Sequence, residues 1–304
     1  SLTPDAAAQR NREIVTNLEV ALTEEGLDRS EIQLVSRGDS TLRGHGVVEP
    51  AVLERCFGPF AATLHVPAFI EGGRTTVNGV HLLHGEPVHT TPFAKDRLFG
   101  FSTSDLSHWL EQKSAGAICA ADVVKVSLED LDQASAGEMP HLIQRLAALQ
   151  GNTAVVVDAE HQSQLAALAA AVLALKGERR FLFRSAASVV KALADPGPQP
   201  LDSDGLARLR RRGSNGEELP GLVMVGSHVP LADQQLMRLL ADPRCIGFEL
   251  PVRRIARVLD GGTPDLLLLD MEREWCEHLQ ALLQSGRTPV LFTSRGEIRL
   301  ASAS

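Results

Sequence analysis

The 304-residue chain carries 30 Lys and Arg against 38 Asp and Glu, a formal net charge of −8, and 44% of its residues are hydrophobic. This composition is ordinary for a soluble globular protein and excludes wholesale disorder. A chain this acidic has no overall positive potential that would attract nucleic acid or an anionic membrane, so neither is expected as a partner. At roughly 100–200 residues per domain, the length predicts two domains.

The cysteines are scattered, with no C-x-x-C pair and no histidine at metal-ligand spacing; they are Cys56, Cys119, Cys245 and Cys276. This spacing argues against a disulfide scaffold or a zinc ribbon, so we expect reduced thiols, no metal site and a cytoplasmic location. The longest apolar run, residues 165–175, is too short to span a bilayer. No signal peptide is visible, but the first residue is Ser, which leaves a processed or trimmed amino terminus open.

Helix and strand patterns alternate along the first 194 residues. Thr3 before Pro4 predicts a helix start, and Gly26 predicts its end. Further helices are expected at 47–56, 105–111, 128–150, 162–175 and 185–194, and strands at 32–36, 61–66, 117–120, 123–126, 153–157 and 181–183. The alternation predicts an α/β fold of mostly parallel sheets with helices on both faces.

A proline-rich segment, 195–200, and a basic run, 208–212, separate the two halves of the chain. We interpret the basic run as a solvated linker rather than a nucleic-acid patch. The first domain is accordingly placed at 1–210 and the second at 211–304. In the second domain we expect strands at 222–225, 245–250 and 289–292 and helices at 231–240 and 266–284.

The densest group of chemically active side chains follows the first predicted strand. This loop combines two guanidiniums, one carboxylate and two hydroxyls with glycines; the candidates are Asp39, Ser40, Thr41, Arg43 and Gly44. Ligands bind at the carboxyl ends of strands in open α/β sheets, and arginine pairs with carboxylates and phosphates through a bidentate fork. The competing interpretation is a solvated loop in which Asp39 caps a turn and Arg43 pairs with it.

A second glycine-containing loop repeats this arrangement after the next predicted strand, with Arg74 and Thr75. Two such loops after neighbouring strands are expected to converge on one anion. Taken alone, the second loop is better explained by a Gly-Gly turn with an exposed arginine, and the two loops together favour a site. A third loop adds Lys95 and Asp96, which either meet the substrate at the rim or form an exposed ion pair. The histidines between residues 45 and 89 lack zinc-protease spacing and are interpreted as core or rim residues.

In the second domain, Gly226 and Ser227 lie between a predicted strand and a predicted helix. Backbone N–H groups in such a turn can hold a phosphate. Neither a Walker A nor a G-x-G-x-x-G motif is present, so an ordinary strand-to-helix turn is the alternative.

The strings D-S-T-L-R-G at 39–44 and P-A-F-x-x-G-G-R-T at 67–75 resemble signatures of the four-carbon acid sugar kinase family. Segments 91–96, 183–186 and 226–236 are similar to three further motifs of that family, in the same order. The resemblance implies a cytoplasmic kinase that uses ATP and Mg²⁺ to phosphorylate a tetronate of the threonate, erythronate or 3-oxotetronate type. The first domain is then expected to bind the acid sugar and the second ATP, with the site in the cleft between them.

The resemblance also implies roles for the candidate residues. Asp39 is the expected catalytic residue, which orients or deprotonates the accepting hydroxyl. Arg43 and Arg74 are expected to clamp the substrate carboxylate or the transferring phosphate. The full substrate-binding set comprises Ser40, Thr41, Arg43, Gly44, Arg74, Thr75, Lys95 and Asp96, and the nucleotide-binding set comprises Gly226 and Ser227.

The chain also departs from the family pattern. The family's acidic opening loop and its closing glycine-rich nucleotide loops have no counterpart, so the first domain is expected to lack its opening loop and the second to be incomplete. His45 stands where Asn is usual, and Arg184 where Gly is usual. The alternative is a non-catalytic acid-sugar-binding or regulatory module, which direct ATP binding separates from a kinase. A third interpretation, a scaffold whose loops are only solvated turns, and an oligomeric state both stay open.

Overall fold

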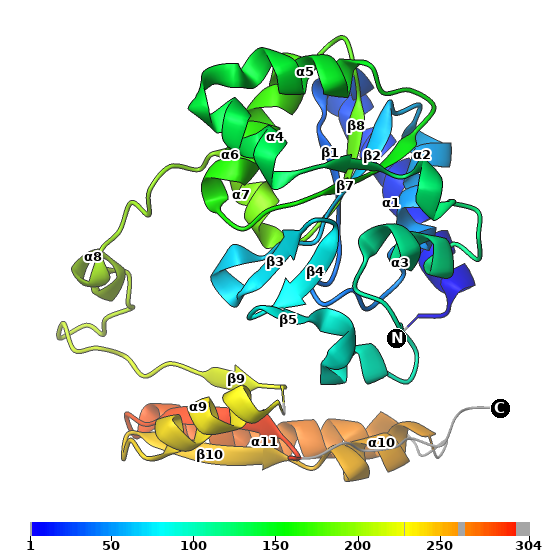
Figure 1. Cartoon of the computed structure of the whole chain (residues 1–304). Helices are drawn as coiled ribbons and strands as arrows, with labels where there is room; N and C mark the ends of the chain where they lie inside the picture. Colours follow the sequence, from blue (N-terminus) through cyan, green and yellow to red (C-terminus); the bar gives the residue numbers. More distant parts are fainter. Residues whose placement is uncertain (1, 228, 261–264, 296–304) are drawn as a thin grey trace. The chain divides into compact units, whose positions relative to one another are not determined.

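The computed structural model describes residues 2–227, 229–260 and 265–295. The chain divides into two compact units, Ser1–Gly197 and Pro198–Ser304, and each is described by itself (Figure 1). The division falls inside the proline-rich segment. The boundary expected at residue 210 lies within the second unit, and the ligand assigned to each domain stays a prediction.

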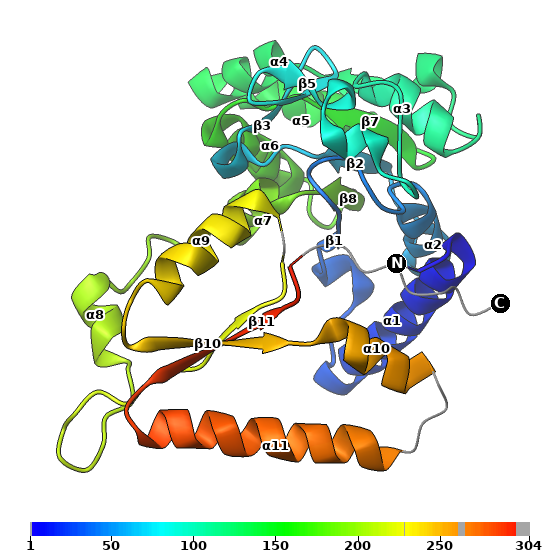
Figure 2. The ribbon, with the colours of Figure 1, turned by 90° about the horizontal axis from the view of Figure 1, so that it is seen from below.

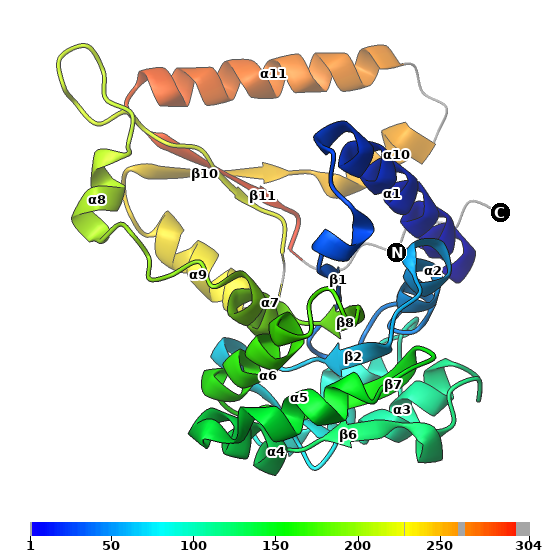
Figure 3. The ribbon, with the colours of Figure 1, turned by 90° about the horizontal axis from the view of Figure 1, so that it is seen from above.

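A five-stranded parallel sheet forms the centre of the first unit, with the strand order β1-β8-β2-β7-β6 (Figure 3). Its strands are β1 (Leu34–Arg37), β2 (Ala62–Val66), β6 (Val124–Val126), β7 (Thr153–Val157) and β8 (Phe181–Ser185). All neighbouring pairs run parallel. The carboxyl ends of β1, β8 and β2 therefore lie side by side, and the chain segments that follow them meet at one edge of the sheet.

Helices cover both faces of this sheet, which confirms the predicted fold class (Figure 3). On one face, Leu64 and Phe183 of the strands pack with Leu168 in the largest cluster of buried side chains. On the other face, Leu182 packs with residues of the first two helices. The first unit contains α1 (Pro4–Glu25), α2 (Val48–Phe57), α3 (Leu106–Lys113), α4 (Leu128–Gln133), α5 (Met139–Ala147), α6 (Gln162–Ala174) and α7 (Ala187–Ala194).

A small antiparallel sheet occupies part of the stretch that follows β2, where the sequence has no clear period. It consists of β3 (Arg74–Val77), β4 (Val80–Leu83) and β5 (Glu86–Pro87). Asn78 and Gly79 join β3 to β4 with φ values of 53° and 78°, the left-handed pair that a two-residue hairpin turn requires. A bridge between Thr76 and Ala159 attaches this hairpin to the segment after β7.

Two further predictions in the first unit are wrong. The strand expected at 117–120 is absent, because a short 3-10 helix occupies Ala120–Asp122. The single helix expected at 128–150 is broken between α4 and α5, where Gly137 has a φ of 117° and leaves the helical region. A glycine in that conformation interrupts the regular helix, so the chain restarts it with Pro140 in the first turn of α5.

The second unit contains a three-stranded parallel sheet with the order β10-β11-β9, and α9 and α11 lie on opposite faces of it (Figures 2 and 3). α10 was not among the helices expected from the sequence. No helix in the described part of the chain combines the length and the apolar character that a bilayer crossing requires. The elements are α8 (Ser203–Arg208), β9 (Val223–Val225), α9 (Pro230–Leu240), β10 (Cys245–Leu250), α10 (Val252–Asp260), α11 (Asp265–Gln284) and β11 (Thr288–Thr293).

Candidate functional site

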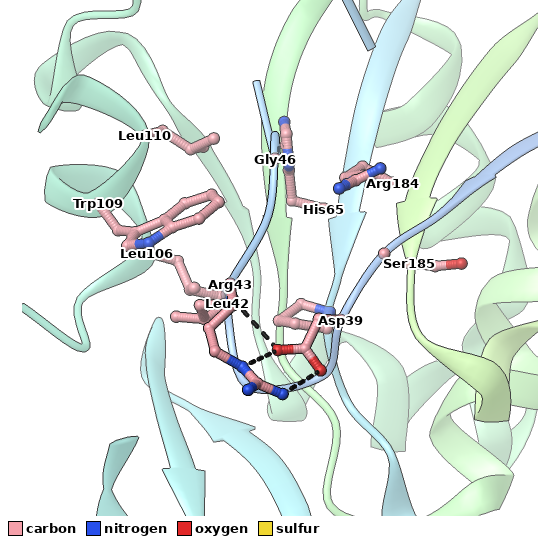
Figure 4. A pocket seen from close by; sticks show the side chains of 12 residues that line it. Asp39, Leu42, Arg43, Gly46, His65, Leu106, Trp109, Leu110, Arg184 and Ser185 are labelled. Carbon is pink, nitrogen blue, oxygen red and sulfur yellow. Dashed lines mark hydrogen bonds and ion pairs between the residues drawn. The ribbon is translucent and has the colours of Figure 1, made fainter. Parts of the chain in front are cut away.

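The loop after β1 folds back on itself around the carboxylate of Asp39. Arg43 donates to this carboxylate from Nε at 2.9 Å and from its backbone N–H at 3.3 Å, and the hydroxyl of Thr41 donates a short hydrogen bond to it. The Arg43 guanidinium also lies 4.9 Å from the ring centroid of Phe93, a cation–π distance. The pair lies at one end of a pocket (Figure 4). The Arg43 guanidinium thus already has a protein carboxylate as its partner.

The surroundings keep Asp39 ionised at neutral pH. Burial raises the pKa of this carboxyl, but hydrogen bonds from Arg43 and Thr41 oppose the increase, and the net pKa lies below its usual value. A carboxylate with a low pKa is a weak base. It is therefore suited to accept a hydrogen bond from a hydroxyl and orient it, rather than to remove its proton early in a reaction.

The backbone of the same loop adopts left-handed conformations at Leu42, with a φ of 65°, and at Gly44, with a φ of 96°. Such a φ is costly for leucine and persists only where the surroundings fix it. Here the Leu42 side chain is buried in a cluster that includes Val88 and Trp109. The loop is therefore held in one shape by its packing before any ligand arrives.

Gly46 lies so close to Trp109 that a larger residue does not fit. A Cβ atom at residue 46 would lie 2.3 Å from Cη2 of the indole ring. We expect Gly46→Ala to lower the free energy of unfolding by about 1–3 kcal/mol, because overpacking forces α3 or the loop to move. Urea unfolding measures this change. The matched control is Gly221→Ala, where no atom lies within 4 Å of the added Cβ, and equal stability losses for the two variants would contradict the expectation.

His81 of β4 connects the loop after β1 to the hairpin after β2. Its side chain is fully buried; Nε2 donates to the Ser40 carbonyl at 2.8 Å, and Nδ1 lies 3.0 Å from the Thr76 hydroxyl, which donates to it. Burial lowers the pKa of His81 to about 4, so the ring is neutral and can both donate and accept. The two loops that the sequence singled out therefore lie next to each other, and His81 joins them.

Arg74, however, does not line the pocket around Asp39. Its Nη1 donates to the Gly72 carbonyl at 2.5 Å, its guanidinium lies 5.8 Å from the Phe69 ring centroid, and its Nε is buried without an acceptor. Thr75 pairs with Leu82 across the β3–β4 hairpin. The contribution of Arg74 and Thr75 to substrate binding stays a prediction.

The third predicted loop lies beside the first one: its Phe93 ring contacts the Arg43 guanidinium. Lys95 is exposed there. Asp96 accepts backbone hydrogen bonds from Leu98 at 2.9 Å and Phe99 at 3.0 Å, and these bonds lower its pKa. Asp96 therefore stabilises the turn that follows it, and Lys95 remains a candidate for the rim of the site.

Two residues on the strand side of the pocket were not predicted as site residues: Arg184 of β8 and His65 of β2 (Figure 4). They are register partners in the sheet. Burial lowers the pKa of His65 to about 3, with a smaller contribution from the Arg184 charge, so the imidazole is neutral. Leu106, Trp109 and Leu110 of α3 form the apolar wall. An arginine directly after the apolar run 181–183 is the sequence signal that would have identified Arg184.

In the second unit, Gly226 and Ser227 follow β9, as the sequence predicts for a strand-to-helix turn. The Gly226 carbonyl accepts from the Thr293 hydroxyl at 3.1 Å, and the Ser227 carbonyl accepts from Nη2 of Arg295 at 2.6 Å. Arg295 also forms an ion pair with Asp233 of α9. Val229, the N-cap residue of α9, has an apolar side chain and makes no capping hydrogen bond among the residues that the structure describes. Nucleotide binding at this turn stays a prediction.

Magnesium requires little from the protein when phosphates supply most of its ligands: one or two carboxylates are enough. Among the residues that the structure describes, no group of three or more His, Cys, Asp or Glu side chains is arranged to hold a metal. In the pocket itself Asp39 is the carboxylate, so among the described pocket residues it is the side chain with the ligand chemistry that a phosphate-bound Mg²⁺ prefers.

Comparison with known proteins adds independent evidence. Residues 1–193 match the family described as the sugar-binding N-terminal domain. A D-threonate kinase of Cupriavidus necator is 32% identical over 208 residues, which are 66% of this chain and 44% of that enzyme. The chain therefore spans less than half the length of that relative.

Solved structures show the same fold. A Salmonella typhimurium LT2 protein superposes with a TM-score of 0.60 at 16% identity, and a Haemophilus influenzae protein with a TM-score of 0.56 at 18% identity. In both cases the match covers 94% of this chain and 61% of the other. The family match over residues 1–193, the D-threonate kinase relative and the shared motifs agree, and the chain belongs to the family of four-carbon acid sugar kinases.

Proposed function

We propose that the protein acts as an ATP-dependent kinase for a four-carbon acid sugar of the threonate, erythronate or 3-oxotetronate type. The observation that carries this proposal is the ionised Asp39–Arg43 cluster beside a pocket at the carboxyl edge of a parallel sheet. The D-threonate kinase activity of the relative in Cupriavidus necator supports the choice of substrate class. The free cysteines among the described residues are consistent with a cytoplasmic enzyme.

Phosphoryl transfer depends on positioning and charge neutralisation more than on covalent chemistry. In the proposed reaction Asp39 accepts a hydrogen bond from the attacking hydroxyl and aligns it with the phosphate. Arg43 holds the Asp39 carboxylate in place and adds positive charge near the phosphate as negative charge develops on it. Mg²⁺, when bound to ATP, neutralises the β- and γ-phosphates.

In this proposal the second unit binds the nucleotide. The turn at Gly226 and Ser227 lies at the carboxyl end of a parallel sheet, and its carbonyls are held by Thr293 and Arg295. That leaves the backbone N–H groups at the start of α9 as the donors for a phosphate. The same geometry serves an ordinary strand-to-helix turn, so nucleotide binding must be measured directly.

The test is a phosphoryl-transfer assay with ATP and Mg²⁺ over D-threonate, L-threonate, erythronate and 3-oxotetronates, with calorimetry of ATP binding in parallel. The proposal predicts transfer to at least one of these acids. ATP binding and acid binding without transfer would instead support an inactive kinase. Acid binding without ATP binding would support the non-catalytic binding module, and binding of neither would overturn the proposal.

Arg43 also sets the pH range in which Asp39 works. In Arg43→Gln the carboxylate loses its main stabilising partner, so we expect its pKa to rise toward the ordinary value. The acidic limb of the kcat/KM profile should then move to higher pH. Arg97→Gln, which changes an arginine outside the pocket, is the control. An acidic limb that does not move in Arg43→Gln would exclude Asp39 as the titrating group.

A further inference from the structure

Arg184 is buried in the wall of the pocket, yet only part of its guanidinium has a partner. Nη1 donates to the Ser36 hydroxyl at 2.8 Å and forms an ion pair with Glu49 of α2. Of the residues that the structure describes, none accepts from Nε or Nη2 of Arg184. Neither atom is among the fully enclosed polar atoms without a partner, in contrast to Nε of Arg74. The Nε–Nη2 edge of Arg184 therefore has no acceptor among the described residues and is not completely enclosed.

The backbone of Gly38 fixes the orientation of this guanidinium. A Cβ atom at residue 38 would lie 2.8 Å from Cζ, from Nε and from Nη2 of Arg184 alike. Equal distances to these three atoms place that Cβ above the plane of the guanidinium, on the side of its Nε–Nη2 edge. The absence of a side chain at residue 38 therefore leaves room beside this edge. Only glycine permits such close stacking, because any side chain would displace the guanidinium.

The pocket beside this edge is small. It has about 30 Å³ of free volume, enough for one or two water molecules or for one group of three heavy atoms. Leu106, Trp109 and Leu110 close its far side and exclude water from part of it. An arginine edge with two parallel N–H donors matches the two oxygens of a planar carboxylate, and such bidentate pairs are strong when partly desolvated.

We propose that Arg184 is the carboxylate receptor of this site: its Nε–Nη2 edge binds the acid group of the substrate in the pocket, and it thereby selects acid sugars over neutral sugars. This inference rests on the proposed function and adds to it the residue that recognises the acid. The remaining hydroxylated carbons do not fit the same free volume, and they extend out of the pocket on the side of Asp39 and Arg43 (Figure 4). Arg43, whose guanidinium is paired with Asp39, then acts at the reacting hydroxyl and the phosphate and does not bind the acid group.

The charge of Glu49 is expected to lower the affinity of Arg184 for the acid group. Its carboxylate shares the Arg184 guanidinium with the incoming acid, so it competes with the ligand for the same positive charge. Removing the Glu49 charge should strengthen acid binding, whereas removing the Arg184 charge should weaken it. Two substitutions within one ion pair are thus expected to act in opposite directions, which a purely structural role of the pair does not predict.

The experiment is calorimetry of the full chain with four probes: D-threonate, succinate, the neutral polyol threitol and inorganic phosphate. Arg184→Gln should weaken D-threonate binding about 10- to 100-fold, the range expected for a lost charged hydrogen-bond pair, and leave threitol binding unchanged. Glu49→Gln should tighten D-threonate binding several-fold. Gly38→Ala, which keeps both charges and displaces the guanidinium, should weaken it as Arg184→Gln does. The double variant Arg184→Gln/Glu49→Gln removes both charges, so it shows the effect of losing Arg184 without leaving Glu49 unpaired.

The outcomes separate this inference from the proposed function. Unchanged D-threonate affinity in folded Arg184→Gln or in the double variant would overturn the assignment of Arg184 and leave the proposed kinase intact. Arg184-dependent binding of succinate without binding of D-threonate would support the carboxylate receptor and contradict the acid sugar. Arg184-dependent binding of phosphate alone would overturn the carboxylate assignment. No binding of any of the four probes would overturn the assignment of Arg184, whereas the proposed kinase is decided by the transfer assay over all the tetronates.

Discussion

Asp39→Asn is expected to lower kcat for phosphoryl transfer by a factor of about 10²–10⁴, the range for loss of a general acid–base or orienting group. Asparagine has nearly the same shape, but its neutral amide oxygen accepts a weaker hydrogen bond from the attacking hydroxyl than the charged carboxylate does. Steady-state kinetics with the preferred acid sugar measures the effect. The KM for the acid should change less than kcat, because in this account the acid group is held by Arg184 rather than by Asp39.

The substitution also removes the partner of Arg43, so the folded state needs its own control. Thermal unfolding of Asp39→Asn shows whether the loop after β1 is still held in place. Asp122→Asn, which changes an exposed aspartate outside the pocket, should leave kcat unchanged. A kcat within twofold of the native value in well-folded Asp39→Asn would remove Asp39 from the reaction.

Acidification from pH 7.5 to pH 5 is expected to destabilise the fold by about 2 kcal/mol for each of His65 and His81. Burial lowers their pKa values to about 3 and about 4, from 6.5 in the unfolded chain. Between the folded and unfolded pKa values the unfolded state binds more protons, so stability is complete above pH 6.5 and decreases as the pH falls. Urea unfolding at several pH values measures the slope.

Replacing one of these histidines with glutamine should remove about half of the slope, because each contributes independently. His141→Gln, at an exposed position, should leave the slope unchanged. Asp158 acts in the opposite direction, since burial raises the pKa of its carboxyl in the folded protein. Equal stability at pH 7.5 and pH 5 would contradict the assignment of neutral, buried histidines.

Much of the parallel sheet follows from local patterns. Short apolar runs closed by turn residues predicted β2, β7 and β8, and the cap at Thr3 and the stop at Gly26 marked both ends of α1. The hairpin of β3 and β4 was missed although Asn78 and Gly79 are a strong turn signal, because its strands lack a clear apolar alternation. The break at Gly137 was missed because a glycine inside a helical pattern is often tolerated.

The residues of the site were predicted less completely than the strands of the sheet. Local composition identified Asp39 and Arg43 because glycines, hydroxyls and charges gather in one short loop. The pairing of Arg43 with Asp39 was the competing interpretation of this loop, and the structure confirms it. Composition did not reveal that Arg74 would bond within its own loop, because that depends on side-chain geometry. Arg184 is distant in sequence from both loops and reaches the pocket only because β8 inserts between β1 and β2.

Hydrogen–deuterium exchange with and without D-threonate tests the location of the site most directly. The account predicts slower exchange in peptides that cover residues 36–46 and 181–186, and unchanged exchange in the peptide that covers α5 on the opposite face of the sheet. D-threonate binding that protects other segments and leaves both of these unchanged would contradict the account.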